Sequence, residues 1–442
     1  MRLPPGLDGI SLQELGATTF TLAALGSASA AWLAAAARRY RRLIRFRRSI
    51  GSEARTFIER AEAAGELRYP PAWIDHDRQE RGIVMCAGGA SLLAQAYTTL
   101  DVLRNLHGCQ LPVTLFFAGP EEMSARCQRF FETKFEPLEC VDATATPARP
   151  LHVKTRNLRG YPLKAHAFLN ARFDEFLSLD ADCAPLRDPT YLFESPPHRE
   201  HGNVFWPDTS MISTAVRHPS SKQIYSFRDE QNRSTVQSLN PRIFDYLDLP
   251  RPCTPQRASY ETESGQLLID RRICFRAVQL AWFINSRSRF FYLYMHGDKD
   301  TYRLAFAVAG QEFCQLQQRS HQAGVVQGER FSGRAAIQRD HRGEAAFLHQ
   351  THRKPDLKEP WLPLTHVVED PAVDHPRPRA RRGLSMLADV TKLEKIQPVD
   401  GAVRHVDEFI RASRESLRSD LESADLPPRP RKRWLQRRIL PW

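Results

Sequence analysis

With 442 residues, 42% of them hydrophobic, the chain can form one large domain or two modest ones around a real core. Its formal charge of +12 comes from three short basic segments, which lie in terminal or Pro-rich stretches at 38–48, 377–382 and 429–438. A nucleic-acid-binding surface would instead spread basic residues among aromatic ones over a folded face. We therefore expect no nucleic-acid partner, and interpret these segments as solvated or membrane-facing tails.

The amino end carries an uncharged run, 17–37, that is long enough to cross a bilayer but is mostly Ala, Ser and Thr. It is a possible membrane anchor. A cleaved signal peptide fits less well, because Arg2 before the run is balanced by Asp8 and Glu14. If the run spans a membrane, the arginines directly after it favour a cytosolic position for the domain that follows.

Residues 38–80 have the pattern of a basic helical connector, and the folded body begins at Arg81. From there, strand and helix patterns alternate through "GIVMCAGG", "SLLAQAYTTLDVLRNLHG", "LPVTLFFAGP", "EEMSARCQRFFETKF" and "LECVDA". Such alternation predicts an α/β fold with βαβ units on a mostly parallel central sheet flanked by helices. Open sheets of this kind bind ligands outside the carboxyl ends of their strands.

The rest of the body contains a loop and helix before an apolar strand at 175–180, a helix around 220–230, and a long helical stretch ending near Asn285. The last strands are expected through "GRAAIQRD" and "GEAAFLHQ". The Pro and Arg content rises beyond about 370, and one more helix is expected near 402–425. We thus divide the chain into a possible anchor, a connector, a body and a Pro/Arg-rich extension, at 1–37, 38–80, 81–370 and 371–442.

Two glycines, Gly88 and Gly89, follow the first strand. They could let the backbone approach a nucleotide closely, or they could simply form a tight strand-to-helix turn. Without a GxGxxG pattern, the sequence does not separate these two interpretations.

Asp180 and Asp182 follow an apolar strand, one residue apart, in "EFLSLDADCAPLRDP". Carboxylates so spaced suit Mg²⁺ or Mn²⁺, which take oxygen ligands and often bridge carboxylates to phosphate oxygens. Alternatively, Asp182 or Asp188 caps the next helix at the start of a solvated loop. A phosphohydrolase with an aspartyl nucleophile is a third possibility, but Ala184 stands where such enzymes normally carry Thr or Val.

The stretches "DADCAPLRDPTYLFES", "GNVFWPD", "ESGQLLIDR", "GDKDTYRLA" and "FLHQ" occur in an order that resembles the fungal-type α-1,3-mannosyltransferase family of nucleotide-sugar glycosyltransferases. The likeness begins near "GIVMCAGG" and ends near Lys354. It implies a GT-A-type fold, a divalent cation, GDP-mannose as donor, a glycan acceptor and retention of the anomeric configuration.

By position, the resemblance makes Asp180 and Asp182 metal and nucleotide-binding residues and His349 a further metal ligand, with His352 as the fallback. An imidazole ligand favours Mn²⁺ over Mg²⁺. Lys164 would neutralise a donor phosphate, although the segment here reads "AHAF" where the family more often shows "PFAL". Alternatively, Lys164 is a solvated lysine on a helix, and His349 is a surface or core histidine.

The same resemblance places Trp206 and Asp208 on the donor side of the cleft, where Gly88 is also a candidate by its position after the first strand, and makes Gln266, Glu263 and Asp208 candidate catalytic residues. Trp206 could equally fill the core, and the stretch around Gln266 could be a polar turn before a helix. An amide is too weak a nucleophile for a stable covalent intermediate, so Gln266 would stabilise an oxocarbenium-like state during front-face transfer. Acceptor hydroxyls would meet Asp298 and Asp300, unless Asp300 caps the next helix.

The sequence therefore predicts a metal-dependent, retaining glycosyltransferase, with α-mannosyl transfer from GDP-mannose as the first expectation. Another hexose donor is the closest alternative, and a catalytically silent, membrane-tethered binding protein is the opposing class. The resemblance implies a Golgi membrane enzyme with a luminal domain, whereas the arginines after the apolar run favour the cytosolic side. The sequon at Asn232 could be glycosylated only in a luminal domain.

Overall fold

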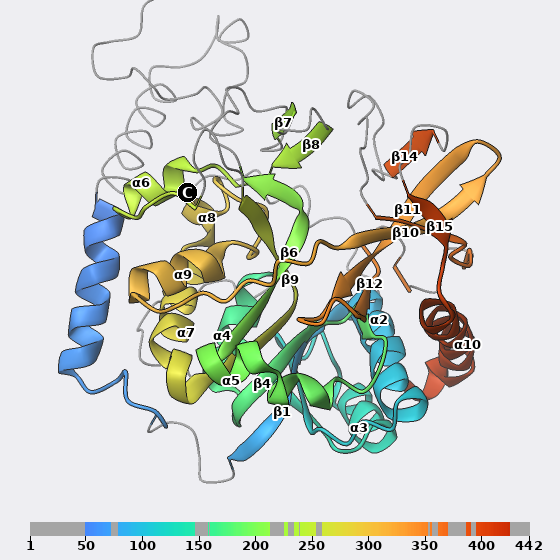
Figure 1. Ribbon diagram of the computed structural model, residues 1–442. Coiled ribbons are helices and arrows are strands. Elements are labelled where there is room, and N and C mark those ends of the chain that lie inside the picture. Colours follow the sequence, from blue (N-terminus) through green and yellow to red (C-terminus); the bar gives the residue numbers. More distant parts are fainter. Residues whose placement is uncertain are drawn as a thin grey trace, which may run out of the picture.

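The computed structural model describes residues 49–71, 78–145, 158, 160–212, 225–228, 234–237, 239–252, 259–351, 354–355, 361–369, 386–389 and 395–424. At its centre lies a six-stranded sheet with the order β3-β2-β1-β4-β9-β6 (Figure 1). Its strands are β1 (Gln79–Cys86), β2 (Val113–Phe117), β3 (Leu138–Asp142), β4 (Phe173–Asp180), β6 (Asn203–Ile212) and β9 (Ser259–Asp270).

The first four strands along the chain are mutually parallel, and β9 is antiparallel to both of its neighbours, β4 and β6. Five strands therefore run in one direction, which confirms the predicted α/β fold with a mostly parallel sheet. The interior strands are apolar on both sides, as a sheet covered by helices requires. In β1, for example, Val84 faces one hydrophobic cluster while Ile83 and Met85 face the other.

Helices cover both faces of this sheet (Figure 1). On one face lie α4 (Pro162–Asn170), α7 (Arg271–Ser286) and α9 (Thr301–Ala309). On the other lie α2 (Gly89–Asp101), which continues as a π-helical turn (Val102–Leu106), and α3 (Ala125–Lys134), whose Ser124 side chain accepts a hydrogen bond from the Cys127 backbone N–H.

A second sheet consists of antiparallel pairs in the order β15-β13-β10-β11-β12-β5, with β14 also paired to β11. Its strands are β5 (Cys183–Pro185), β10 (His321–Gln327), β11 (Arg330–Arg339), β12 (Ala345–His349), β13 (His366–Val368), β14 (Met386–Asp389) and β15 (Ile396–Pro398). Because β5 follows β4 after only two residues, this sheet starts where the central sheet ends.

The remaining elements are short: a 3₁₀ helix (Pro189–Glu194), α5 (Pro196–His201), β7 (Tyr225–Arg228), β8 (Ser234–Gln237), α6 (Arg242–Tyr246) and α8 (Ser288–Phe291). The helix expected around 220–230 is wrong where the structure describes it, because 225–228 forms a strand that pairs with β8. The polar stretch "ETESGQ" is part of the long strand β9 and does not form the turn considered from sequence.

Two segments outside the family-like body pack against it. The helix over 49–63 buries Ile50, Ala54 and Ile58 in the cluster that also contains α7. The helix expected at 402–425 runs as α10 (Gly401–Ala424), and its Asp420 accepts a hydrogen bond from Tyr97 of α2.

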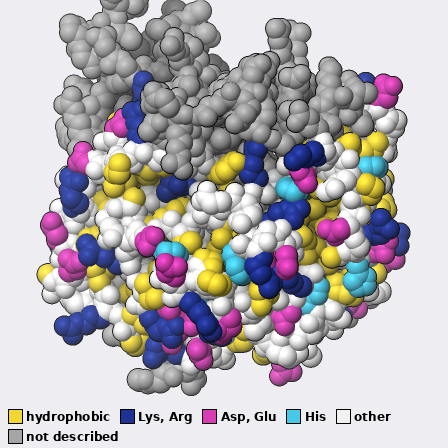
Figure 2. Space-filling model, in the orientation of Figure 1, with side chains coloured by type: hydrophobic (Ala, Val, Ile, Leu, Met, Phe, Trp, Pro, Cys, Tyr) yellow, Lys and Arg dark blue, Asp and Glu magenta, His cyan; other side chains and the backbone are white. Residues whose placement is uncertain are grey.

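The face drawn in Figure 2 carries acidic and basic side chains intermixed over the described residues. The three basic segments and the apolar run 17–37 lie outside the described residues, as do Asn232 and His352. Among the residues that the structure does describe, none of the helices combines the length and the hydropathy needed to cross a bilayer.

Candidate metal and donor site

Three potential metal ligands meet at the carboxyl end of the central sheet. Asp180 is the last residue of β4, Asp182 directly precedes β5, and His349 is the last residue of β12. One ligand atom from each of them lies within 4.8 Å of those of the others. The structure therefore brings together the three residues that the sequence predicted as metal ligands.

Strand pairing explains why residues so far apart in sequence meet. β12 pairs antiparallel with β5, so that His349 lies opposite Cys183, the residue after Asp182. The backbone N–H of Gln350 donates to the backbone oxygen of Asp182 at 2.9 Å. The short second-sheet strand β5 thus holds the histidine beside the aspartates.

His349 lies between two carboxylates. Its Nε2 is 3.4 Å from Asp182 Oδ1, and its Nδ1 is 3.4 Å from Glu263 Oε2. Burial alone would lower the pKa of His349, but Glu263 and Asp182 raise it to about 10. Conversely, although burial would raise the pKa values of both carboxyls, the charge of His349 lowers them well below their usual range.

The other end of Asp182 contacts the ammonium group of Lys354, through Oδ2. Burial raises the pKa of Asp180, and the charge of Asp182 adds to this effect while Lys164 opposes it. Because the charge of Asp182 opposes ionisation of Asp180, a divalent cation bound by both carboxylates would stabilise the pair.

Lys164 is buried beneath Asp180. Its Nζ lies 2.6 Å from Asp180 Oδ1 and 3.3 Å from Asp298 Oδ2, and it donates to the Ser264 backbone oxygen at 2.7 Å. Burial favours the neutral amine, but the two carboxylates outweigh it and raise the pKa of Lys164 above its usual value. The site therefore contains a fixed positive charge next to a predicted metal ligand.

Glu263, Gly265 and Gln266 all lie on β9, next to β4. The Gly265 backbone N–H donates to Glu263 Oε1 at 2.9 Å, and a Cβ on Gly265 would come within 2.9 Å of the His349 ring. Glu263 contacts the imidazole of His349, and the absence of a side chain at Gly265 leaves the space that the ring occupies. The structure thus favours a positioning role for Glu263, through His349.

Gln266 is fully buried beside the end of β4, where it pairs with Leu179. Its Oε1 accepts from Cys183 Sγ at 3.3 Å, while its Nε2 has no hydrogen-bond partner among the described residues. An unpartnered buried amide N–H₂ group is costly unless something else accepts from it. A contact with a sugar requires space to open beside this amide, and its catalytic role stays a prediction.

Asp208 lies on β6 and pairs with the ammonium group of Lys299. Burial opposes the charge of Lys299, yet Asp208, Glu263 and Glu261 raise its pKa above the usual value. Lys299 therefore links the predicted donor-side residue Asp208 electrostatically to the carboxylate that holds His349.

For several predicted site residues, the structure favours the alternative interpretation, because they are buried in other contacts. Trp206 is fully buried, with Nε1 donating to the Arg339 backbone oxygen at 2.9 Å and its ring edge-to-face with Phe347. It fills the core, and no sugar face can reach it in this structure. A Cβ on Gly88 would lie 2.1 Å from Glu122 Oε2, so this glycine serves a tight turn before α2.

The predicted acceptor-binding pair is also buried. Asp298 accepts from Ser264 Oγ and Tyr302 OH in addition to its pairing with Lys164. Asp300 is the N-cap residue of α9, but its Oδ1 accepts from Thr262 and does not cap the helix. Both carboxylates support the floor of the site and are not open to an acceptor.

Sequence reasoning missed Lys299 and Lys354, the two lysines that pair with Asp208 and Asp182. The signals were present: Lys299 stands between Asp298 and Asp300, and Lys354 follows His349 by five positions. A lone lysine in an acidic or loop stretch is usually solvated, so the sequence alone assigns neither lysine to the site.

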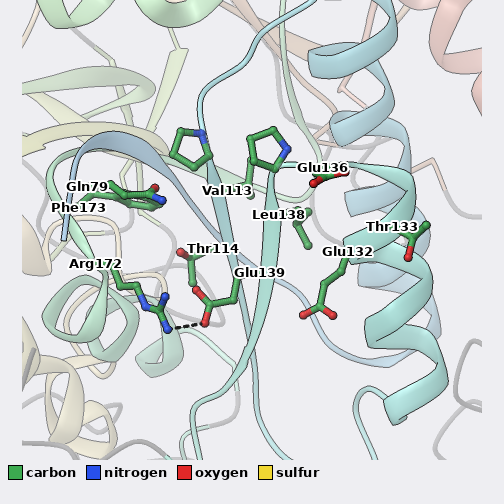
Figure 3. Close-up of a pocket in the computed structure, with 12 residues that line it drawn as sticks. Gln79, Val113, Thr114, Glu132, Thr133, Glu136, Leu138, Glu139, Arg172 and Phe173 are labelled. Atoms are coloured by element: carbon green, nitrogen blue, oxygen red, sulfur yellow. Dashed lines mark ion pairs between the residues drawn. The ribbon is translucent and has the colours of Figure 1, made fainter. Parts of the chain in front are cut away.

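A cavity of about 580 Å³ lies at the amino ends of the parallel strands of the central sheet, whereas the candidate site lies at their carboxyl ends (Figure 3). Its lining includes Gln79, Val113, Leu138 and Phe173, which are the first residues of β1, β2, β3 and β4. Ligands of open α/β sheets bind at the carboxyl ends of the strands. This cavity is therefore distinct from the candidate site.

The model of the family described as "Mannosyltransferase putative" matches residues 80–347 of the chain. The matched stretch contains Asp180, Asp182 and all of β9, and it ends two residues before His349.

Alpha-1,2-mannosyltransferase MNN21 of Candida albicans is 27% identical over 269 residues, which cover 54% of this chain and 39% of the relative. Alpha-1,2-mannosyltransferase MNN2 of Saccharomyces cerevisiae is 25% identical over 274 residues, which cover 58% of this chain and 45% of the relative. The chain thus matches less than half the length of either relative.

Among solved structures, the Mn/GDP form of core-mannan synthase A from Aspergillus fumigatus aligns with a TM-score of 0.30 and 10% identity, over 53% of this chain and 71% of the other. The galactosyltransferase LgtC, solved with donor and acceptor sugar analogs, aligns with a TM-score of 0.30 and 16% identity, over 53% and 73% of the two chains. Such low TM-scores do not establish any shared detail of a binding site.

Proposed function

Because the chain belongs to the mannosyltransferase family whose model matches residues 80–347, we propose that it is a metal-dependent, retaining glycosyltransferase that transfers α-mannose from GDP-mannose to a glycan hydroxyl. The single observation that carries the metal-dependent part is the cluster of Asp180, Asp182 and His349. GDP-mannose as the donor rests on the sequence resemblance and on the mannosyl chemistry of the family.

The residues present fit a divalent cation. Two carboxylates and one imidazole offer an oxygen-rich donor set that suits Mn²⁺, and such a cation would relieve the repulsion by which Asp182 raises the pKa of Asp180. Asp180, Asp182 and His349 would hold it. When bound, the cation would supply Lewis-acid stabilisation of the leaving diphosphate.

The remaining stabilisation of charge would come from side chains of the protein itself. Lys164 places a buried positive charge beside Asp180, where it would offset the negative charge of the donor diphosphate electrostatically. Gln266 lies beneath the same end of β4 and would stabilise the developing positive charge of the sugar. Because its amide is a poor nucleophile, the hydroxyl of the acceptor would attack from the face that the diphosphate leaves.

The linkage is proposed separately from the donor. The sequence resemblance suggested an α-1,3 bond, whereas the two relatives described above are named α-1,2-mannosyltransferases. On the names of these relatives, we expect an α-1,2 product first and an α-1,3 product second. The linkage depends on how the acceptor is oriented, and the metal cluster does not determine it.

Two other functions remain as alternatives with distinct outcomes. Another hexosyltransferase would keep the cluster but take a different nucleotide sugar. A catalytically silent binding protein would have no need of a complete ligand set, and the presence of Asp180, Asp182 and His349 together argues against it.

The proposed donor and metal can be tested together by thermal unfolding of the purified protein with a panel of nucleotide sugars. GDP-mannose should raise the melting temperature when Mn²⁺ is present and should lose this effect when EDTA is added, because a ligand stabilises only the state that binds it. Stronger stabilisation by a UDP-hexose would replace the donor assignment. Absence of any Mn²⁺-dependent effect across the panel would refute the metal-dependent function.

For cellular placement, we propose a Golgi membrane with the body on the luminal side, on the sequence resemblance alone. Protease treatment of sealed microsomes tests it. The body over 81–354 should stay intact until detergent is added, whereas digestion without detergent would place it in the cytosol. A shift in electrophoretic mobility after glycosidase treatment, absent in Asn232→Gln, would independently support the lumen.

A further inference from the structure

Four large hydrophobic side chains are exposed in the described part of the chain: Leu92, Tyr161, Ile273 and Leu362. Tyr161 is the aromatic one among them and is 51% exposed. Exposed single apolar residues are ordinary, and an aromatic ring becomes informative only when it is fixed in place beside a site. Tyr161 meets that condition.

The Tyr161 ring is held from behind by three residues. It packs edge-to-face on Tyr292 at a centroid distance of 6.0 Å, and on His296 at 6.3 Å. Gly297 completes the contact, because a Cβ there would lie 3.0 Å from ring atoms Cε2 and Cζ. The backbone of Gly297 has a φ of 67°, which further restricts this position to glycine. One side of the ring is therefore fixed while the remainder faces solvent.

The segments that contain Tyr161 and Gly297 also contribute residues to the candidate site. Tyr161 directly precedes α4 and stands three residues before Lys164, a spacing that puts both side chains on one side of the helix start. Gly297 directly precedes Asp298, which pairs with Lys164 at 3.3 Å. Burial raises the pKa of Tyr161, and the charges of Asp298 and then Asp180 raise it further, so these carboxylates lie within electrostatic range of the ring.

We propose that Tyr161, backed by Tyr292, His296 and Gly297, is a stacking platform for a pyranose ring of the acceptor glycan. This inference rests on the proposed function. Tyrosine suits such a role because it offers a rigid apolar face and a polar tip at little cost in conformational entropy. Its sugar partner would stack through the C–H groups of one ring face while its hydroxyls stay in water.

The position of the ring favours the acceptor over the donor. The charged diphosphate of a nucleotide sugar belongs with Lys164 and the metal cluster, in which Lys164, Asp182 and His349 are buried and Asp180 is half-buried. An acceptor glycan must instead arrive from solvent and remain largely solvated beyond the sugar that reacts. A half-exposed ring at the edge of the site meets that requirement.

The test compares Tyr161→Ala with Tyr161→Phe, which keeps the ring, and with Ile273→Ala, a matched change at another exposed apolar residue on α7. Three constants are measured on the full chain: KM for mannobiose as acceptor, KM for GDP-mannose, and the rate of GDP-mannose hydrolysis without acceptor. Tyr161→Ala should raise the acceptor KM about 10-fold, which corresponds to about 1.4 kcal/mol, and leave the two donor constants unchanged. The other two variants should behave like the wild type.

Saturation-transfer NMR with mannobiose gives a second readout that needs no turnover. The mannobiose signal should be present with the wild type and Tyr161→Phe and lost with Tyr161→Ala. A rise in the KM for GDP-mannose alone would instead assign the ring to the purine base and overturn the proposal, as would unchanged binding in Tyr161→Ala. If the wild type binds mannobiose through Tyr161 but transfers no mannose, the proposed function fails while the platform stands.

Discussion

At the scale of single residues, Asp182 is the predicted metal ligand whose carboxylate contacts both His349 and Lys354. Asp182→Asn keeps the shape and removes the charge. We expect it to weaken Mn²⁺ binding by at least about 100-fold, because replacing a direct ligand should cost more than the 10- to 100-fold typical of outer partners. Electron paramagnetic resonance of free Mn²⁺ measures this affinity directly.

Asp248→Asn provides the matched control, because Asp248 is 69% exposed and pairs only with the exposed Arg55 in the described contacts. Circular dichroism should show both variants folded. Equal Mn²⁺ affinity in Asp182→Asn and the control would remove Asp182 from the metal site.

Gln266 can be tested at the same scale. Gln266→Ala should lower kcat by roughly 10- to 1000-fold, the range for losing one preorganised electrostatic group, with little change in the KM for GDP-mannose. The exposed Gln317, replaced by Ala, serves as the control. If the KM rises and kcat at saturation does not change, Gln266 is a binding residue and its proposed role in the transition state is wrong.

At the scale of elements, β9 separates what the sequence predicted from what it could not. The parallel strands β1, β2, β3 and β4 were predicted because each contains a short apolar run between turn residues. β9 contains the polar stretch "SYETESG" before its apolar end, and a run of polar residues normally indicates a turn or loop. Here Glu261 and Glu263 are buried because Leu239 N–H, Gly265 N–H and His349 lie beside them.

The metal ligands were predictable for other reasons: Asp180 and Asp182 follow an apolar strand one residue apart, and His349 was predicted from the family resemblance. What the sequence could not supply was side-chain direction. Trp206 and Asp298 both lie on segments of the family resemblance, yet each turns inward to partners that come from distant strands or helices. Burial of that kind depends on packing between elements, which no local pattern encodes.

The close approach of the His349 ring to Gly265 gives a prediction for β9. Gly265→Ala would bring a methyl group within 2.9 Å of the imidazole and displace it, so Mn²⁺ affinity should fall about 10-fold, as for other losses of support around a metal ligand. Gly401→Ala is the matched control, since a Cβ there meets nothing within 4 Å. Should both variants bind Mn²⁺ equally, the glycine does not define the position of His349.

The pairing of β10 with β11 contains a pH-sensitive contact remote from the metal cluster. Burial, assisted by the charge of Arg339, lowers the pKa of His321 from its usual 6.5 to about 4. The unfolded chain therefore binds a proton between pH 6.5 and 4 that the folded chain does not, so stability should fall as the pH falls through this window. Urea titrations at several pH values, in the wild type and in His321→Gln, measure the effect.

His321→Gln should show a shallower loss of stability between pH 6.5 and 4 than the wild type. His366, which lies on the neighbouring strand β13 and shows an exposed side-chain hydrogen bond to Thr365, is the matched control when replaced by Gln. Parallel pH profiles for the wild type and His321→Gln would show that His321 does not titrate in this range.

At the scale of the whole molecule, the candidate site requires both sheets. The central sheet supplies Asp180 and, through β9, Glu263 and Gln266, while the second sheet supplies His349. The family match ends two residues before His349, and the pairing of β5 with β12 is what places this histidine beside the aspartates. The central claim is therefore that these two sheets together form a metal-dependent mannosyltransferase site.

One measurement tests that claim most directly: transfer of ¹³C-labelled mannose from GDP-mannose to mannobiose by the full chain, followed by NMR of the product with Mn²⁺ and with EDTA. The account predicts a new α-linked mannose that forms with Mn²⁺, is absent with EDTA and is absent with Asp182→Asn. A β-linked product, or equal transfer in the presence of EDTA, would contradict it.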